Sequence, residues 1–211
     1  MSARKYQELG FIYNYIAGSS ENVLLLLHGT GGNEDDLLTV GQMLDRNGSI
    51  VAPRGKVLEN GMPRFFRRIS PGVFDIEDLK FRANELGEFV DLLCKKYGFD
   101  SRSLVGVGYS NGANLVASLV LLKPTLLRRS ILFRAMLPLV PDKIPDLNGT
   151  SVFISGGKYD EMIPEESTLE LSSILLRSGA NIKMNWEEST HALTADEVNK
   201  AREWLLNTKL Q

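Results

Sequence analysis

The sequence contains one cysteine, Cys94, and two histidines, His28 and His191. A lone cysteine excludes an internal disulfide and fits a reducing compartment. Cys94 follows Leu92 and Leu93 in a predicted helix, which favours a place in the core over a reactive thiol. Two histidines without a further one at ligand spacing cannot build a usual zinc site. We therefore expect neither a metal nor another cofactor.

Strong charge and long apolar runs are also missing. The formal net charge is −2, so no strong field favours nucleic acid or an anionic membrane. No apolar segment follows the basic start at Arg4 and Lys5, and no uninterrupted apolar run approaches the length of a membrane span. We expect a cytoplasmic protein that acts on a small neutral or acidic molecule. The oligomeric state stays open, a homodimer included.

The chain has 211 residues, of which 43% are hydrophobic, enough for a well-buried core in one domain spanning 1–211. Segments with strand and helix patterns alternate, which predicts an α/β fold with a mostly parallel sheet, helices on both faces and no separate cap domain. The segment 23–27 is expected in the centre of the sheet and 11–16 at an edge. Expected strands are 11–16, 23–27, 48–53, 104–108, 130–133, 151–155 and 181–186, and expected helices are 34–44, 75–97, 111–122, 165–178 and 194–206.

The stretch Gly108-Tyr109-Ser110-Asn111-Gly112 lies between a predicted strand and a predicted helix. It matches the G-x-S-x-G nucleophile elbow, in which a tight turn exposes the serine and glycines remove colliding side chains. A dinucleotide-binding turn is disfavoured because Asn111 stands where that motif needs glycine or alanine. A tight turn without chemistry stays open for a lone motif of this kind.

A serine nucleophile needs a base, and the base needs an acid to orient it. His191 follows the last predicted strand and comes after Ser110, as the order serine, acid, histidine requires. His28 precedes the serine and is expected to brace a loop. Asp160 follows the strand 151–155 and is the best candidate acid, with Glu161 as its competitor. Turn or capping roles explain Asp142, Asp146 and Asp196.

Two backbone N–H groups are expected to bind the oxyanion that forms during attack. One belongs to Asn111, directly after the serine, and the other to Thr30 in the glycine-rich turn after the strand 23–27. That turn is not a phosphate-binding loop, because Asn33 and Glu34 stand where such a loop needs lysine and a hydroxyl residue.

Four segments, 27–32, 108–112, 157–164 and 190–191, together resemble the signatures of the phospholipase/carboxylesterase branch of the α/β-hydrolases. The resemblance spans nearly the whole chain and implies an α/β-hydrolase fold and serine-esterase chemistry. The stretch 55–68 is similar to bacterial hydrolases associated with methylhydroquinone and catechol resistance, which implies small ester, lactone or ring-fission substrates.

The resulting hypothesis is a serine hydrolase in which Ser110 attacks an ester or thioester carbonyl, His191 relays the proton and Asp160 holds the imidazole.

The long segment 54–74 lacks clear periodicity, and such loops are often functional. Its segment 64–68 could place a cation near a substrate carboxylate, with Phe65 or Phe66 lining an apolar pocket, or it could be a solvated basic face. Candidate substrate-binding residues are Arg64, Phe65, Phe66 and Met162. A catalytically silent ligand-binding relative and an acyltransferase or peptidase with the same residues are the alternatives.

Overall fold

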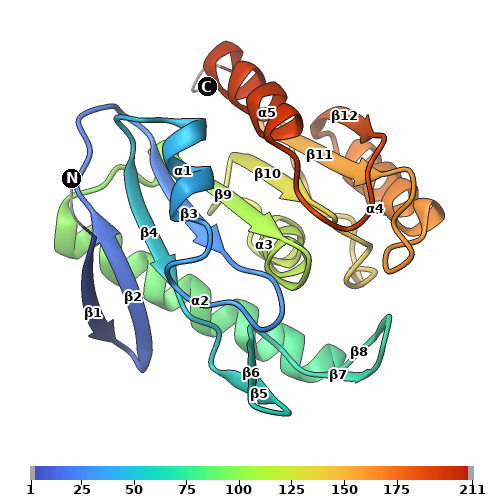
Figure 1. Cartoon of the computed structure of the whole chain (residues 1–211), viewed down its shortest axis with the longest axis horizontal. Coiled ribbons are helices and arrows are strands. Elements are labelled where there is room, and N and C mark those ends of the chain that lie inside the picture. Colours follow the sequence, from blue (N-terminus) through green and yellow to red (C-terminus); the bar gives the residue numbers. More distant parts are fainter. Residues whose placement is uncertain (1–2, 209–211) are drawn as a thin grey trace.

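The computed structural model describes residues 3–208, which are built around an eight-stranded sheet (Figure 1). The sheet order is β1-β2-β4-β3-β9-β10-β11-β12. The six strands from β4 to β12 in this order run parallel, and β1 and β2 pair antiparallel at one side. The strands are β1 Arg4–Glu8, β2 Phe11–Ile16, β3 Val23–Leu27, β4 Ser49–Pro53, β9 Leu104–Tyr109, β10 Arg129–Phe133, β11 Ser151–Gly157 and β12 Asn181–Glu187.

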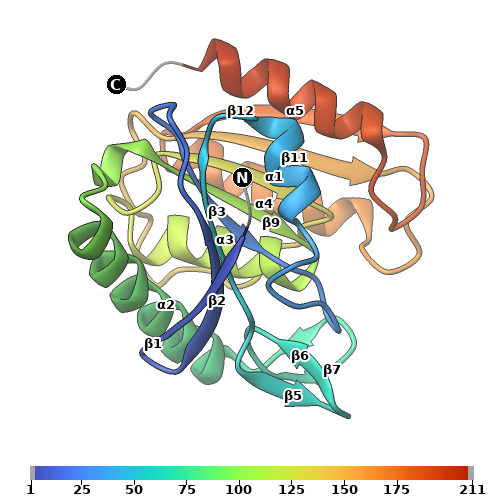
Figure 2. The same cartoon turned by 60° about the vertical axis from the view of Figure 1, so that its left-hand side comes forward.

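Helices cover both faces of the sheet (Figures 1 and 2). Successive residues of a strand point to opposite faces, so a central strand must be apolar throughout. In β3, Val23, Leu25 and Leu27 pack in one core cluster, and Leu24 and Leu26 pack in the other. The first cluster contains α2 (Ile76–Tyr97), α3 (Asn111–Leu122) and α4 (Glu165–Arg177), and the second contains α1 (Leu38–Leu44) and α5 (Ala195–Asn207).

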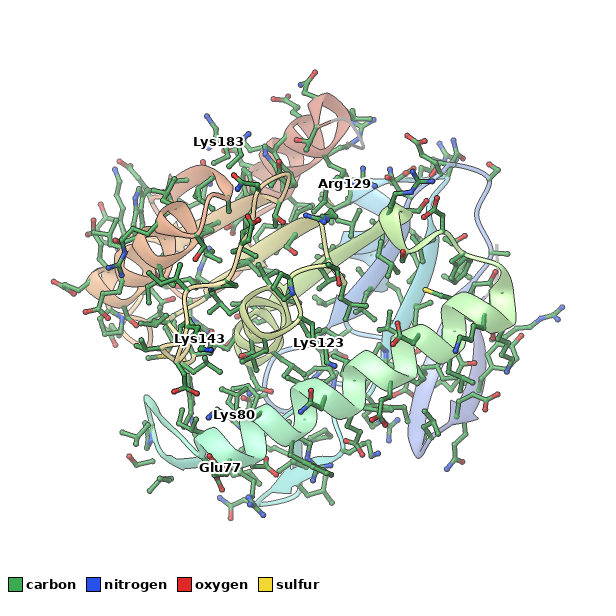
Figure 3. The ribbon with its side chains drawn as sticks, turned by 180° about the vertical axis from the view of Figure 1, so that it is seen from behind. Glu77, Lys80, Lys123, Arg129, Lys143 and Lys183 are labelled. Atoms are coloured by element: carbon green, nitrogen blue, oxygen red, sulfur yellow. The ribbon has the colours of Figure 1, made fainter. Side chains whose placement is uncertain are left out.

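Local capping signals set the ends of the longer helices. The Asp75 carboxylate accepts the Asp78 N–H at the start of α2, and Gly98 ends that helix in the left-handed conformation. Thr194 and Glu197 form a reciprocal capping box at the start of α5. Figure 3 shows α2 from behind with Lys123 at the end of α3, and a side chain at Gly87 would collide with the Lys123 stem. Gly87 thus leaves room for the outer part of the Lys123 side chain against α2.

Three expectations about the elements were wrong. β2 is not an edge strand, because β1 pairs outside it through a hairpin whose turn residues Leu9 and Gly10 both have positive φ. The helix predicted from residue 34 begins only at Leu38. One reason is that the Glu34 side chain turns inward to bind Arg54.

The third correction concerns 54–74, which forms two short hairpins instead of an irregular loop (Figure 2). One is β5 (Val57–Glu59) with β6 (Met62–Arg64), and the other is β7 (Arg68–Ser70) with β8 (Val73–Phe74). Asn60 and Gly61 have φ values of 51° and 80°, as the Asn-Gly turn of a two-residue hairpin requires.

Among residues 3–208, no helix combines the length and the apolar character needed to cross a membrane.

Candidate active site

The segments that follow β9, β11 and β12 lie at the carboxyl edge of the parallel sheet (Figure 1), and three of their side chains meet there. Ser110 follows β9, Asp160 follows β11 and His191 follows β12. The Ser110 Oγ lies 3.0 Å from His191 Nε2, and His191 Nδ1 lies 2.8 Å from Asp160 Oδ2. A carboxylate only accepts hydrogen bonds, so Nδ1 carries the proton and Nε2 faces the serine as an acceptor. The geometry can therefore move a proton from the hydroxyl to the imidazole.

Ser110 stands in a strained turn between β9 and α3. Its φ and ψ are 52° and −115°, and its N–H donates to the Phe133 carbonyl at 2.9 Å. A Cβ at Gly108 would lie 2.5 Å from the Ala113 backbone, and one at Gly112 would lie 2.0 Å from the Leu27 carbonyl oxygen. Both glycines of the motif are thus required because β3 and α3 approach the turn closely. This packing holds the hydroxyl in its exposed position.

The Asp160 carboxylate is buried and oriented by its own loop. Its side chain is 1% exposed, and its Oδ1 accepts the N–H groups of Met162 and Ile163 at 2.8 and 3.1 Å. Oδ2 is left to face His191. Glu161, the alternative acid, is exposed to solvent and makes no hydrogen bond to His191 within the described residues. The geometry favours Asp160 as the partner of the imidazole.

Sequence reasoning missed Arg134, which holds the segment that carries His191. Its buried guanidinium donates to the carbonyls of Thr190 and Ala192 at 3.1 and 2.7 Å, and it pairs with Glu197 at 2.6 Å. Arg134 adopts a positive φ of 57°, and its Nε lies 3.9 Å from Asp160 Oδ2. The available signal was an arginine directly after the apolar strand 130–133, and nothing local shows where such a side chain points.

The loop 28–32 presents Thr30 beside the serine. Within residues 3–208, neither the Thr30 N–H nor the Asn111 N–H donates to another group, and both residues border the cavity that contains Ser110. They are free to bind a developing oxyanion, as expected for a helix N-terminus and an adjacent loop.

His28 braces this loop from inside the protein. Its Nε2 accepts the Gly55 N–H at 2.9 Å, so Nδ1 donates to the Gly29 carbonyl at 2.6 Å. Burial lowers the pKa of His28 below its ordinary value and keeps the ring neutral. His28 is therefore far better suited to holding the backbone than to taking a proton from Ser110.

A cavity of about 520 Å³ opens beside Ser110. Of the four candidate substrate-binding residues, Arg64 and Met162 border it, and Phe65 and Phe66 do not. The two phenylalanines are 2% and 0% exposed, and they pack on His28 and Phe74 respectively. The expectation that they line an apolar pocket is wrong, because the short hairpins turn both rings into the core.

The reading of 64–68 as a solvated basic face is also wrong for Arg64. Its side chain is 3% exposed, and its Nη1 donates to Thr30 Oγ1 at 2.7 Å. Only Arg67 of this segment points into solvent, where it pairs with Asp75. Arg68 of the same segment borders the cavity, and so do residues that the sequence did not single out, among them Phe74, Asn114, Met136 and Ile163. No group of three or more His, Cys, Asp or Glu side chains within 3–208 could hold a metal ion.

The chain is similar to known proteins over most of its length. The chain matches the Phospholipase/Carboxylesterase family model over residues 16–209. A Bacillus subtilis (strain 168) protein named "Putative hydrolase MhqD" is 47% identical over 190 residues, which cover 90% of this chain and 95% of that protein. The Bacillus cereus carboxylesterase structure matches with a TM-score of 0.92 and 44% identity, over 94% of this chain and 95% of that one.

Two further structures are each 30% identical to the chain. The carboxylesterase from Mesorhizobium loti has a TM-score of 0.92 and covers 97% of this chain and 98% of its own. YahD, solved with malic acid, has a TM-score of 0.89 and covers 94% and 100%. The sheet with its two helical layers and the matched family model lead to the same assignment. The chain belongs to the phospholipase/carboxylesterase family and is a hydrolase with the α/β-hydrolase fold.

Proposed function

We propose that the protein hydrolyses small carboxylic esters, thioesters or lactones through an acyl-enzyme formed on Ser110. The observation that carries this proposal is the continuous chain of hydrogen bonds from the Ser110 hydroxyl through His191 to Asp160. Such a chain raises the nucleophilicity of an otherwise weak hydroxyl. Because this chain of hydrogen bonds lies at the elbow of a carboxylesterase-family protein, a catalytically silent ligand-binding protein is the weaker alternative.

In the first half of the reaction, Ser110 Oγ forms a bond to the substrate carbonyl carbon, and its proton passes to His191 Nε2. The carbonyl oxygen becomes an oxyanion that accepts hydrogen bonds from the Thr30 and Asn111 N–H groups. Asp160 stabilises the imidazolium and keeps its orientation. When the tetrahedral intermediate collapses, the bond to the alcohol oxygen or thiol sulfur breaks, and that atom takes the proton from His191.

In the second half, His191 takes a proton from water, and the resulting hydroxide forms a bond to the acyl carbon. The bond from carbon to Ser110 Oγ then breaks, and Oγ recovers the proton. A cavity of about 520 Å³ without a separate cap fits small substrates. YahD was solved with malic acid, and an acid of that size is the kind of product that we infer for this cavity.

Substitution of the proposed nucleophile tests the mechanism. We expect Ser110→Ala to lower kcat on a p-nitrophenyl ester series by about 10⁴-fold or more, because no other group can form the acyl-enzyme. A fluorophosphonate should label the wild type and not the variant. Ser101→Ala, on the exposed 3₁₀ turn before β9, is the matched control and should keep full turnover.

Wild-type turnover in Ser110→Ala would refute the nucleophile assignment. A folded wild-type sample that resists fluorophosphonate labelling and cleaves no ester would favour the ligand-binding alternative instead. Product analysis with added alcohol separates hydrolysis from acyl transfer, because transfer yields a new ester where hydrolysis yields only the free acid.

A further inference from the structure

The cavity beside Ser110 contains more hydrogen-bond donors than its protein acceptors use. Four of its lining side chains, Arg64, Arg68, Asn111 and Asn114, have N–H groups that bond to nothing else within residues 3–208. Buried or half-buried donors without partners are costly unless a ligand or water satisfies them. The distribution of these donors therefore carries information about the ligand.

Asn114 lies one helical turn after Ser110 and is 3% exposed. Its Oδ1 accepts the Met136 N–H at 3.0 Å. A backbone N–H can only donate, so the amide atom facing it must be the oxygen. The Nδ2 group is consequently the free end of the amide, and Asn114 borders the cavity. The side chain offers two N–H donors to whatever occupies that space.

The two arginines are held together without being neutralised. Arg68 Nε donates to Glu59 Oε1 at 2.9 Å, and Glu59 Oε2 lies 3.4 Å from Arg64 Nη1. Arg64 also donates from Nε to the Phe66 carbonyl and from Nη1 to Thr30. Its Nη2 and both Nη atoms of Arg68 stay free of partners within the described residues. One carboxylate thus positions two cations, which leaves one unbalanced positive charge.

The rest of the cavity contains few protein acceptors that could bind these donors. Glu161 contributes the only carboxylate among the described lining residues, and its side chain is exposed to solvent. Most of the other lining residues are apolar, among them Val73, Phe74, Met136, Met162, Ile163 and Pro164. A ligand that fits must combine an apolar section with an anionic oxygen group.

We propose that the acyl group of the substrate ends in a carboxylate that Arg64, Arg68 and Asn114 bind, so that the preferred substrates are half-esters of short dicarboxylic acids. This inference rests on the proposed esterase function. The acyl side is assigned because His191 must protonate the leaving group. A second hollow of about 490 Å³ is bordered by Thr30, Tyr109, Ala192 and Leu193, the last two directly after His191 in the chain, and in this proposal it takes the leaving alcohol.

The test compares two methyl esters of equal chain length, monomethyl glutarate and methyl pentanoate. We expect the wild type to prefer the charged ester by about 30-fold or more in kcat/KM, since hydrogen bonds to charged groups are the strong ones. High salt should reduce this ratio. Arg68→Gln should lower the ratio by about tenfold.

Asn114→Asp is the sharper variant. It preserves an oxygen for the Met136 N–H and replaces the free N–H₂ group with a carboxylate oxygen, so attraction of the substrate carboxylate becomes repulsion. We expect it to lower the ratio at least as much as Arg68→Gln does. Arg67→Gln is the matched control, because Arg67 is 61% exposed, pairs with Asp75 and does not border the cavity. It should keep both the ratio and the turnover of the wild type.

Equal kcat/KM values for the two esters in the wild type would overturn the proposal, and so would a ratio that neither variant changes. A preference seen only for esters with a carboxylate on the alcohol would overturn the assignment to the acyl side. Calorimetric binding of glutarate to Ser110→Ala needs no turnover, and we expect binding that Arg68→Gln weakens in that background. Failure of the triad would leave this binding intact, so the two failures are distinguishable.

Discussion

Arg134 illustrates how much of the proposed active site depends on a single side chain. Its guanidinium joins the end of β10 to the carbonyls on either side of His191 and to the first turn of α5. The partner, Glu197, also accepts from Ser155 Oγ and from the Thr194 N–H. The position of the imidazole is therefore set by a buried ion pair that takes no part in the chemistry itself.

We predict that Arg134→Met destabilises the protein by about 3–5 kcal/mol, because it leaves the buried Glu197 carboxylate without its partner. Urea unfolding followed by circular dichroism measures the loss. Adding Glu197→Gln should recover part of it, since the second change removes the unpaired charge. A loss below about 1 kcal/mol for the single variant would show that the pair contributes little.

At the scale of elements, the elbow depends on the contact between α3 and β3. Gly112 lies in the first turn of α3, where the Leu27 carbonyl leaves no room for a side chain. The helix N-terminus and the Thr30 loop, which together offer the free N–H groups, are held in register by this contact. The hydrogen bond from the Phe65 N–H to Asn111 Oδ1, at 2.8 Å, ties the hairpin segment to the same turn.

We predict that Gly112→Ala lowers kcat/KM by about 10²-fold, because α3 must shift and displace Ser110 and the Asn111 N–H. Overpacking should also cost about 1–3 kcal/mol of stability. Gly61→Ala is the control, since nothing lies within 4 Å of the added Cβ and only its φ of +80° opposes the change. The prediction fails if steady-state kinetics give Gly112→Ala the activity of the wild type.

At the scale of the whole molecule, a charged cluster of Lys5, Glu34 and Arg54 connects the antiparallel edge of the sheet with the segment that follows the Thr30 loop. Glu34 is 1% exposed and receives two hydrogen bonds from Arg54, at 2.6 and 2.8 Å. Lys5 of β1 lies 2.8 Å from the same carboxylate. Burial opposes ionisation of Glu34, but the hydrogen bonds from Arg54 and Lys5 outweigh it and lower its pKa to about 2.

A lowered pKa in the folded state means that the unfolded chain binds a proton first as pH falls. The stabilisation from Glu34 is therefore complete above its ordinary pKa of 4.5 and is lost as pH falls towards about 2. We predict that Glu34→Gln is less stable than the wild type by about 1–2 kcal/mol at pH 7, a modest value because solvent screens Lys5 and Arg54.

Urea unfolding at several pH values tests this prediction, and the difference between wild type and Glu34→Gln should shrink between pH 4.5 and 2. His28 adds a separate acid sensitivity, because its lowered pKa makes the folded state lose stability below about 6.5. Because the Glu34 charge raises the pKa of His28 against the effect of burial, the variant should be slightly more sensitive than the wild type below 6.5, and the comparison for Glu34 is made between pH 4.5 and 2. A difference that is independent of pH would contradict the role of the Glu34 carboxylate.

The sequence by itself determined the alternation of strands and helices, the parallel centre of the sheet and the chain order of Ser110, Asp160 and His191. These features depend on signals a few residues long: apolar runs, capping residues and the two glycines of the elbow. Carboxyl ends of parallel strands share one edge, so residues placed after three such strands were expected to meet. The pair Asn60-Gly61 is a local signal of the same kind for the hairpin of β5 and β6.

Only the tertiary structure decided which side chains face inward and what they touch. Arg134 became a buried support of His191, Phe65 and Phe66 became core residues, and Asn114 was left with its amide nitrogen free beside the cavity. In each case the partner lies far away in the sequence, and the direction of the side chain depends on packing between elements. A local pattern predicts an element because its cause is local, whereas burial and pairing are properties of the assembled fold.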